Sequence, residues 1–345
     1  MDAVRKALDS VAGANFERQD LSKTITLLDG PPRPISQYAP DVRATGKTHY
    51  WDEQNLIKPG NGAATYAEGA RPTADAVAPS RPSNIVCRIG KVAQVTDTMA
   101  AVWTGAGAYQ LAEGELERLF GEALDFQTTL KTTEVLNEIE IMHLLGDSAN
   151  GAGFAGGQCD GLYKWVLNNG NLLGGASNSS GTAVSLNEGM VKSLAANIAR
   201  AFPILQPDTM LIPPELKPIV NGFVGGGAGR PIVQLVDGDT GGLVGGNEVA
   251  KYNTGFSVVD VRIEPYLSPN YNGSTLGVSG GAYTPPDTAV IFYNRAYVRH
   301  ASLIKLGTEP LARIDTSVSR MITCEFSQEH RAPLHTGMIH FVLTS

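Results

Sequence analysis

Histidines are the residues in this chain whose chemistry is easiest to recognise, because they bind metals and carry protons near neutral pH. The six histidines are His49, His143, His300, His330, His335 and His340. None belongs to an HExxH motif or pairs with a cysteine at the spacing of a zinc site. His335 and His340 lie five residues apart near or on a predicted strand, so their side chains are expected to point to opposite faces. No metal site is predicted, and His143 is expected to be packed or hydrogen-bonded on a helix.

The glycine-rich stretch 222–229 has the composition of a phosphate-binding loop. Such loops need a strand before them and a helix after them, whereas this stretch follows a predicted helix and runs into Arg230 and Pro231 without a GKS or GKT motif. A flexible surface loop over 224–247 is the better interpretation. No GxSxG motif and no cysteine in a nucleophile signature are found, and acidic pairs such as Glu138 and Glu140 are expected on a solvated helix. The sequence therefore predicts no catalytic residue, no cofactor and no enzyme activity.

Composition narrows the class of protein further. An apolar content of 42% and a charged content of 18% are those of a folded protein, and the net charge of −7 argues against a dense surface for gripping nucleic acid. No signal peptide and no apolar run of about eighteen residues for a membrane helix are found. Cys87, Cys159 and Cys324 lie far apart without a CxxC pair, so they are expected to be buried free thiols in a protein made in a reducing cytoplasm.

The element on which the others must depend is a long helix predicted over 109–145. This range contains no proline and only two glycines, Gly114 and Gly121. Its apolar residues recur at steps of three and four, as expected for one stripe of a helix. A coiled-coil arm is the alternative, but the pattern does not keep a strict heptad from end to end. The helix is therefore interpreted as a single beam against which other elements pack.

Two extended segments precede this helix. Residues 1–45 are proline-rich and are interpreted as an arm that folds only against a neighbour. Strand-like runs over 48–56 and 84–99 then flank a segment full of glycine and proline, which is interpreted as a protruding two-stranded arm with its partner on another subunit.

The part after the helix is mixed. A glycine-rich boundary at 150–161 is followed by a short apolar run at 162–167 and by a helix over 186–202, capped by Asn187 or Ser185. Strands are predicted over 209–212, 258–263, 289–293, 296–300, 303–314, 317–326 and 337–343, and the last of these would close a sheet.

This order of elements resembles the major capsid protein of tailed bacteriophages, whose α+β fold is named after phage Hong Kong 97. The local sequence is similar to the branch of the major head protein of phage SU-ten, through Pro207 to Glu215, Thr308 to Arg313 and Glu329 to Ile339. The resemblance implies an N-terminal arm at 1–45, an E-loop at 46–100, a P-domain at 101–150 with its spine helix at 109–145, an A-domain at 151–298, P-domain return strands at 299–331 and a C-terminal strand at 332–345.

The function implied by the resemblance is that of a major capsid protein, which assembles into hexamers and pentamers of an icosahedral shell around double-stranded DNA. Implied partners are other copies of the chain, a separate scaffolding protein, a portal and a decoration or cement protein, with no membrane. The protein would be located in the virion after assembly in the host bacterial cytoplasm. The alternatives are an encapsulin shell around an enzyme cargo and, from another class, a glycine-rich enzyme or small-ligand-binding protein.

Two sets of contact residues follow from the same resemblance. E-loop residues expected to contact a neighbour are Tyr50, Trp51, Glu53, Lys58, Tyr66, Glu68 and Arg71. Residues of the loop expected at the capsomer axis are Gly225, Gly226, Gly227, Arg230, Asp237 and Asp239. Covalent cross-linking in phage Hong Kong 97 joins an E-loop lysine to a P-domain asparagine, and no asparagine occurs from Ala301 to Ser345. A shell without covalent cross-links is therefore expected.

Overall fold

The computed structural model describes residues 32–54, 66–71, 78–96, 99, 115–148, 157–173, 186–201, 206–225, 250–268, 289–313 and 316–340. The helices are α3 (Glu115–Leu145), α4 (Leu162–Asn169), α5 (Glu188–Ala201) and α6 (Lys217–Gly225), with 3-10 helices η3 (Pro214–Leu216), η4 (Pro265–Leu267) and η6 (Pro333–His335). The strands are β1 (Asp41–Arg43), β2 (Thr48–Tyr50), β3 (Ser83–Ile85), β4 (Cys87–Thr96), β5 (Asn171–Leu173), β6 (Thr209–Ile212), β7 (Lys251–Asn253), β8 (Val258–Ile263), β9 (Ala289–Tyr293), β10 (Val298–Pro310), β11 (Ser317–His330) and β12 (Gly337–His340).

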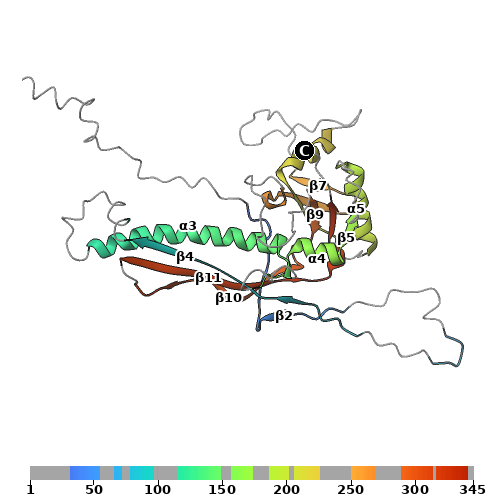
Figure 1. Ribbon diagram of the computed structural model, residues 1–345. Helices are drawn as coiled ribbons and strands as arrows, with labels where there is room; N and C mark the ends of the chain where they lie inside the picture. The colour runs from blue at the N-terminus through green and yellow to red at the C-terminus, as the bar shows by residue number, and fades with distance from the viewer. Residues whose placement is uncertain are drawn as a thin grey trace, which may run out of the picture. The chain divides into compact units, whose positions relative to one another are not determined.

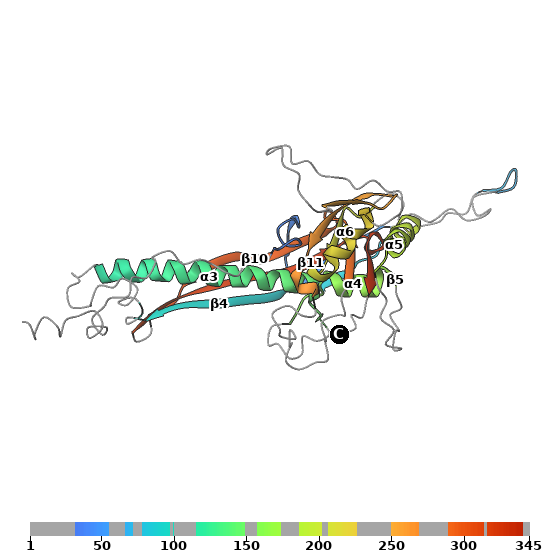
Figure 2. The ribbon, with the colours of Figure 1, turned by 90° about the horizontal axis from the view of Figure 1, so that it is seen from above.

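The long helix α3 packs on a four-stranded sheet of order β1-β10-β11-β4. Figures 1 and 2 both show α3 running alongside β4 and β11. Strand β4 alternates between buried and exposed side chains, which is the pattern of a sheet with one covered face. Its buried residues meet the apolar stripe of α3 in two clusters, formed by Cys87, Ile89, Val135, Ile139, Cys159, Ile322, Cys324 and Phe326, and by Ala93, Val95, Ala123 and Leu124. The predicted helix is thus confirmed over Glu115–Leu145, while residues 109–114 lie outside the described part.

Ion pairs supplement this packing along the edge of α3. Lys91 Nζ on β4 lies 3.0 Å from Glu134 Oε2 and 2.6 Å from Glu138 Oε1 on the helix. Arg320 on β11 contacts Asp125 in the same way. All of these side chains are partly or largely exposed, so the ion pairs orient the helix but contribute little to stability.

A second sheet has the order β5-β12-β9-β6-β8-β7 and is covered on both faces. Residues of α5 and α6 pack on one face through Val191, Leu194, Ile198 and Val220, against Met210, Ile212, Val290, Phe292 and Ile339. Residues of α4 and the end of α3 pack on the other face through Leu144, Leu162 and Val166, against Leu211, Ile291, Tyr293 and Met338. Double coverage explains why β6 and β9 read as continuous apolar runs rather than alternating ones. Since Leu144 belongs to this second core, α3 links the two sheets.

Several sequence predictions are confirmed and others need correction. Strands β6, β8 and β9 lie where they are predicted, and Asn187 caps α5 by accepting a hydrogen bond of 2.9 Å from the Met190 N–H. The apolar run at 162–167 is a helix, α4, and the strands predicted over 296–300 and 303–314 form one strand, β10. The final predicted strand is confirmed over Gly337–His340, where it lies in the second sheet between β5 and β9, and residues 341–343 lie outside the described part.

Residues 32–44 also differ from the expectation of an arm that folds only against a neighbour. Ile35 is 1% exposed and belongs to the second core, and β1 pairs in parallel with β10 through His300, Ala301 and Ser302. This segment folds on its own chain because it supplies apolar side chains and an added strand. Residues 1–31 lie outside the described part. No described helix combines the length and the apolar character that a membrane crossing requires.

Candidate subunit interface and its anchors

The segment predicted to reach a neighbour leaves the subunit as a pair of antiparallel strands, β2 and β3. Beyond the strands, the Glu53 N–H donates to the Ser80 carbonyl and the Ser80 N–H donates to the Glu53 carbonyl, each over 2.8 Å. The two-stranded arrangement is therefore confirmed at the root of the segment. The strand predicted over 48–56 ends at Tyr50, and most of the run predicted over 84–99 forms β4, which pairs with β11. Residues 55–65 and 72–77 lie outside the described part.

Buried polar contacts tie this root to the body of the subunit. His49 Nε2 lies 2.9 Å from Glu329 Oε2 on β11, and both residues are buried. Asn84 Nδ2 donates to the carbonyls of Gln328 over 2.8 Å and Asp160 over 3.0 Å, and its Oδ1 accepts from the Asp160 N–H over 2.9 Å. The Oδ1 atom also accepts from the Ile85 N–H over 2.9 Å, so all four bonding positions of the Asn84 amide are used and the root has one defined orientation.

Two of the predicted contact residues are used inside the subunit. Trp51 is 5% exposed, its ring lies 5.6 Å from that of Trp165, and its Nε1–H donates to Glu53 Oε1 over 3.0 Å. The same Glu53 oxygen accepts from the Ala332 N–H over 2.9 Å. Trp51 and Glu53 therefore stabilise the root of the segment from within.

The remaining predicted residues of this set are placed differently. Tyr50 and Tyr66 are 59% and 61% exposed, and Glu68 and Arg71 are also exposed. Lys58 lies outside the described residues. Of the predicted axis-loop residues, Gly225 is the last residue of α6, while Gly226, Gly227, Arg230, Asp237 and Asp239 lie outside the described part. An ion pair missed from the sequence, Arg81 Nε to Asp52 Oδ1 over 2.6 Å, lies exposed on the root of the segment.

The segment before β1 is held by a carboxylate of α3. Glu140 is fully buried, and its two oxygens accept hydrogen bonds of 2.7 Å each from the N–H groups of Ile35 and Ser36. The expectation that Glu140 lies on a solvated face is wrong, because the chain folds back over this part of the helix. Next to it, Glu264 is also fully buried; its Oε1 accepts from the Tyr266 N–H, and its Oε2 has no hydrogen-bond partner among the described residues. Burial and the nearby charge of Glu140 raise the pKa of Glu264 well above its ordinary value.

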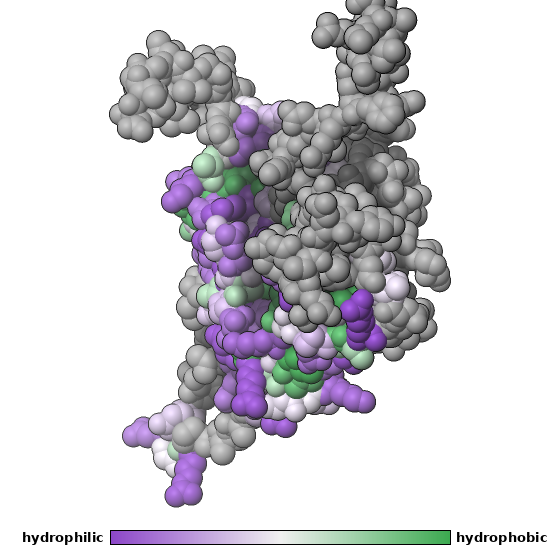
Figure 3. Space-filling model, turned by 90° about the vertical axis from the view of Figure 1, so that its left-hand side faces the viewer, coloured by the Kyte–Doolittle hydropathy of each residue, from purple (hydrophilic) through white to green (hydrophobic). Residues whose placement is uncertain are grey.

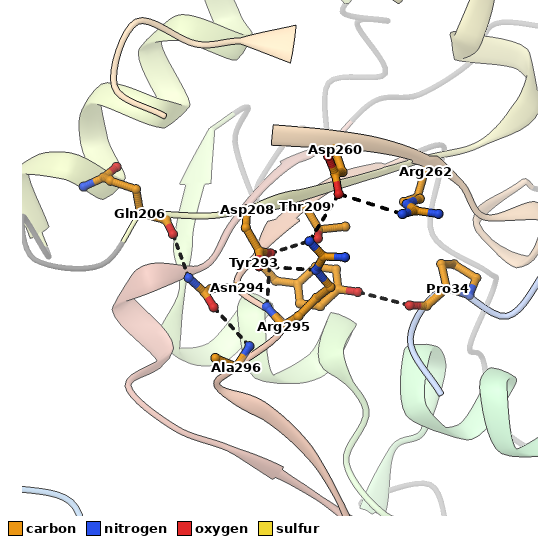
Figure 4. Close-up of polar contacts among 10 residues, drawn as sticks. All are labelled: Pro34, Gln206, Asp208, Thr209, Asp260, Arg262, Tyr293, Asn294, Arg295 and Ala296. Carbon is orange, nitrogen blue, oxygen red and sulfur yellow. Dashed lines mark hydrogen bonds and ion pairs between the residues drawn. The ribbon is translucent and has the colours of Figure 1, made fainter. Parts of the chain in front are cut away.

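Figure 4 shows a second set of contacts, at the end of the second sheet. Arg295 lies 3.3 Å from Asp208 Oδ2 and 3.2 Å from Asp260 Oδ2, so that the ends of β6, β8 and β9 share one ion-pair network. The Tyr38 ring lies 5.0 Å from the Arg262 guanidinium and 5.6 Å from that of Arg295. Tyr293 completes the attachment, because its hydroxyl donates to the Pro34 carbonyl over 3.4 Å.

Four of the histidines, His49, His143, His330 and His335, are buried in the interior. His143 Nε2 lies 2.8 Å from His300 Nδ1, which confirms the hydrogen-bonded role predicted for His143. His330 stacks between the rings of Trp165 and His335, and neither of its ring nitrogens has a hydrogen-bond partner among the described residues. His335 lies in η6, not on a strand. No group of three metal-binding side chains is found in the part of the chain that the structure describes.

The outer part of β10 forms an exposed apolar edge. Ile304 and Leu306 are 49% and 37% exposed, and among the described strands this stretch pairs with β11 alone, because β1 ends opposite Ser302. On the face drawn in Figure 3, small apolar patches lie between hydrophilic residues. An unpaired strand edge with apolar side chains is a surface that proteins normally cover.

Comparisons with known proteins agree on one family and one fold. The family model of the SU10 major capsid protein matches residues 9–343. None of the curated proteins compared with the chain matches it. Among solved structures, a chain from Gordonia phage Cozz is 8% identical with a TM-score of 0.62, covering 98% of this chain and 95% of that one.

Two further solved structures are those of capsids. The capsid of Myoviridae phage XM1 is 11% identical with a TM-score of 0.54, over 95% of this chain and 98% of that one. The capsid of a native GTA particle is 10% identical with a TM-score of 0.60, over 97% and 99% of the two chains. At these identities the structures show the fold, which is the α+β fold of Hong Kong 97-like phage capsid proteins.

Proposed function

Since the chain belongs to the SU10 major capsid protein family, we propose that it forms the hexamers and pentamers of an icosahedral shell around double-stranded DNA. As a major capsid protein of a tailed phage, the chain assembles with copies of itself into the capsid and is part of the virion. The family is one of structural proteins, which supports the further proposal that the chain is not an enzyme. It also favours the phage capsid over both alternatives, the encapsulin and the ligand-binding protein.

The proposed assembly through E-loop contacts rests on the structure of the E-loop root, residues 48–54 and 78–85. His49, Asn84 and Trp51 are committed to contacts within the subunit, whereas Tyr50, Tyr66, Glu68 and Arg71 expose their side chains. A root held by buried contacts, with exposed aromatic and charged residues on it and beyond it, is suited to contacts with a neighbouring subunit. We therefore assign these four residues, with Lys58, to intersubunit contacts, and Trp51 and Glu53 to the root.

The remaining assignments follow the family. The proposed parts are the N-terminal arm at 1–45, the E-loop at 46–100, a P-domain with α3 and the strands at 299–331, and an A-domain at 151–298. The terminal strand at 332–345 is included with the A-domain because β12 pairs with β9. The loop with Gly225, Gly226, Gly227, Arg230, Asp237 and Asp239 is proposed at the capsomer axis. A separate scaffolding protein, a portal and a decoration protein are proposed partners, and assembly is proposed in the host bacterial cytoplasm.

Assembly can be tested on the purified, untagged chain by sedimentation together with negative-stain microscopy. A variant lacking residues 60–77 keeps the Glu53–Ser80 pairing that closes the root. We expect shells, tubes or sheets of capsomers from the wild type, and folded but unassembled subunits from the deletion variant. A matched control replaces 60–77 by a glycine-serine linker of equal length, which should also fail to assemble. Intact shells from either variant would overturn the E-loop assignment. If the wild-type chain sediments only as small species even with its scaffolding protein present, the proposal that it forms a shell would be wrong.

A further inference from the structure

Two cysteines that are distant in the sequence lie in contact beneath α3. Cys87 opens β4 and Cys159 lies between the end of α3 and α4, and their Sγ atoms are 3.5 Å apart. Both residues are buried, with 2% and 0% exposure. A disulfide bond has its sulfurs about 2.05 Å apart. The two sulfurs would therefore have to approach by about 1.5 Å to form the bond.

The backbone around both cysteines is held in place. A Cβ added to Gly161 would lie 2.7 Å from the Gly146 nitrogen and 2.8 Å from the Met142 carbonyl oxygen, so the loop carrying Cys159 packs directly on the end of α3. The Gly161 N–H donates to the Gly146 carbonyl over 2.8 Å. On the other side, the Asn84 amide bonds both the N–H and the carbonyl of Asp160, which follows Cys159. These contacts hold the segment that carries Cys159 against the end of α3 and against Asn84, which lies three residues before Cys87.

The third cysteine serves as an internal comparison. Cys324 lies in the same apolar cluster, on β11, but in the register of the sheet it is opposite Ile89, whereas Phe326 is opposite Cys87. Diagonal neighbours on adjacent strands have side chains separated by about 7 Å, whereas a disulfide needs Cβ atoms about 4 Å apart. Cys324 is therefore placed near Cys87 without the cross-strand geometry to form a disulfide with it.

We infer that Cys87 and Cys159 form an oxidation site at which hydrogen peroxide converts the two thiols into an intrachain disulfide. One sulfur attacks the peroxide oxygen; the O–O bond breaks, a sulfenic acid forms and water leaves. The sulfur of the other cysteine then attacks the sulfenic sulfur, the S–OH bond breaks and a second water leaves as the S–S bond forms. Each sulfur loses one electron and the peroxide takes up both, so one peroxide is converted to two waters.

The rate of this reaction is set by burial. Contact with Cys87 and burial raise the pKa of the Cys159 thiol well above its ordinary value, and burial raises that of Cys324 to about 12. Thiols that stay protonated at neutral pH react slowly, so the reduced form persists in a reducing compartment and oxidation is faster at alkaline pH. The disulfide would tie β4, which continues the E-loop root, to the segment that joins α3 to α4. It would strengthen each subunit of a released particle without a covalent bond between subunits.

The test counts thiols in the purified full-length chain before and after hydrogen peroxide at pH 8. The reaction is stopped with catalase, the protein is unfolded, and free thiols are titrated with a maleimide. We expect the wild type to fall from three free thiols per chain to one, with the loss reversed by dithiothreitol and a peptide linked between Cys87 and Cys159 after non-reducing digestion.

Two variants separate this site from general oxidation. Cys324→Ser should fall from two free thiols to none, whereas Cys159→Ser should keep both. Three thiols remaining in the native wild type, while a denatured sample oxidised alongside loses them, would overturn the inference. So would a linked peptide that contains Cys324, or loss of thiols that dithiothreitol does not reverse. The count does not depend on whether the sample forms shells, so it is independent of the proposed assembly.

Discussion

At the scale of single residues, the carboxyl groups of Glu140 and Glu264 lie in the interior, between α3, the segment before β1 and η4, where the loss of hydration makes a charge most destabilising. Glu140 accepts hydrogen bonds from two main-chain N–H groups, whereas Glu264 accepts a hydrogen bond from one. Because burial and Glu140 raise its pKa, Glu264 takes up a proton on folding. The stability linked to this proton is complete below the unfolded pKa near 4.5 and is lost as the pH rises through the folded pKa.

The wild type loses stability at alkaline pH because the buried Glu264 must then be ionised, and Glu264→Gln is expected to remove this loss. The amide has the shape of the protonated carboxyl and can donate to Glu140, so the free energy of unfolding should rise by about 1 kcal/mol at pH 8 and change less at pH 5. Glu140→Gln should lower it by about 1–3 kcal/mol, because one of the two N–H groups of Ile35 and Ser36 loses its acceptor. Urea unfolding at both pH values measures this, with the partly exposed Glu138→Gln as the control. An equal effect of Glu264→Gln at pH 5 and pH 8 would contradict the assignment.

The buried histidines have the opposite linkage. Burial lowers the pKa of His143, His300 and His330, and lowers that of His335 to about 4. Their contribution to stability is present above the unfolded pKa of about 6.5 and is lost as the pH falls through the folded values. His330 is the sharpest case, because neither ring nitrogen has a hydrogen-bond partner among the described residues.

His330→Phe should keep the stack on Trp165 and remove a group that must charge in acid. We expect little change in the melting temperature at pH 7.5 and a smaller fall than in the wild type on going to pH 4.5. Thermal melts of unassembled subunits across this range provide the measurement. His143→Phe serves as a contrast, since it would break the bond to His300 and should destabilise the protein at every pH. A His330→Phe profile parallel to that of the wild type would refute the role of this histidine.

At the scale of elements, two glycines near the ends of α3 have opposite roles. Gly121 lies within the helix and a Cβ there would meet nothing within 4 Å. Gly146 follows the helix, and a Cβ there would lie 2.6 Å from the Met142 carbonyl oxygen and in contact with the Cys159 carbonyl. The first glycine only weakens the helix, whereas the second permits the close approach of the next loop.

Gly121→Ala should therefore raise the free energy of unfolding by about 0.5–1 kcal/mol, which is the difference in helix propensity. Gly146→Ala should lower it by about 1–3 kcal/mol through overpacking against main-chain atoms that have no room to move. Each variant controls for the other, since both are the same substitution in one chain. Chemical unfolding of both variants and the wild type measures these changes. If the free energy of unfolding changes in the same direction in both variants, the close approach at Gly146 is unimportant.

Most helices and strands can be predicted from the sequence, but the segments against which they pack cannot. Periodicity predicts α3, α5 and the buried strands because local pattern and final packing agree there. The eight residues of α4 are too short and apolar to distinguish from a strand, and the burial of Glu140 and Trp51 depends on segments more than a hundred residues away. The contact of Cys87 with Cys159 has no local signal at all. Such features arise from tertiary packing, which single-sequence patterns do not contain.

At the scale of the whole molecule, a shell subunit must keep surfaces that are incomplete in the monomer. The outer part of β10 fits this requirement, because it exposes apolar side chains and a strand edge without a described partner beyond β1. An edge of this kind is a liability in an isolated protein and is tolerated where assembly covers it. We expect a neighbouring copy of the chain to cover it in the capsid.

The double substitution Ile304→Lys with Leu306→Lys should accordingly separate assembly from folding. Both side chains are more than one third exposed, so the subunit should keep its circular dichroism spectrum and unfold within about 0.5 kcal/mol of the wild type. Two buried, unpaired charges per contact should reduce the yield of shells by tenfold or more, measured by sedimentation. Lys305→Gln, on the same exposed stretch, is the matched control and should leave the yield unchanged. Shells at the wild-type yield from the double variant would mean that this edge stays open to solvent in the capsid, and the contact between subunits would then have to be sought on the E-loop alone.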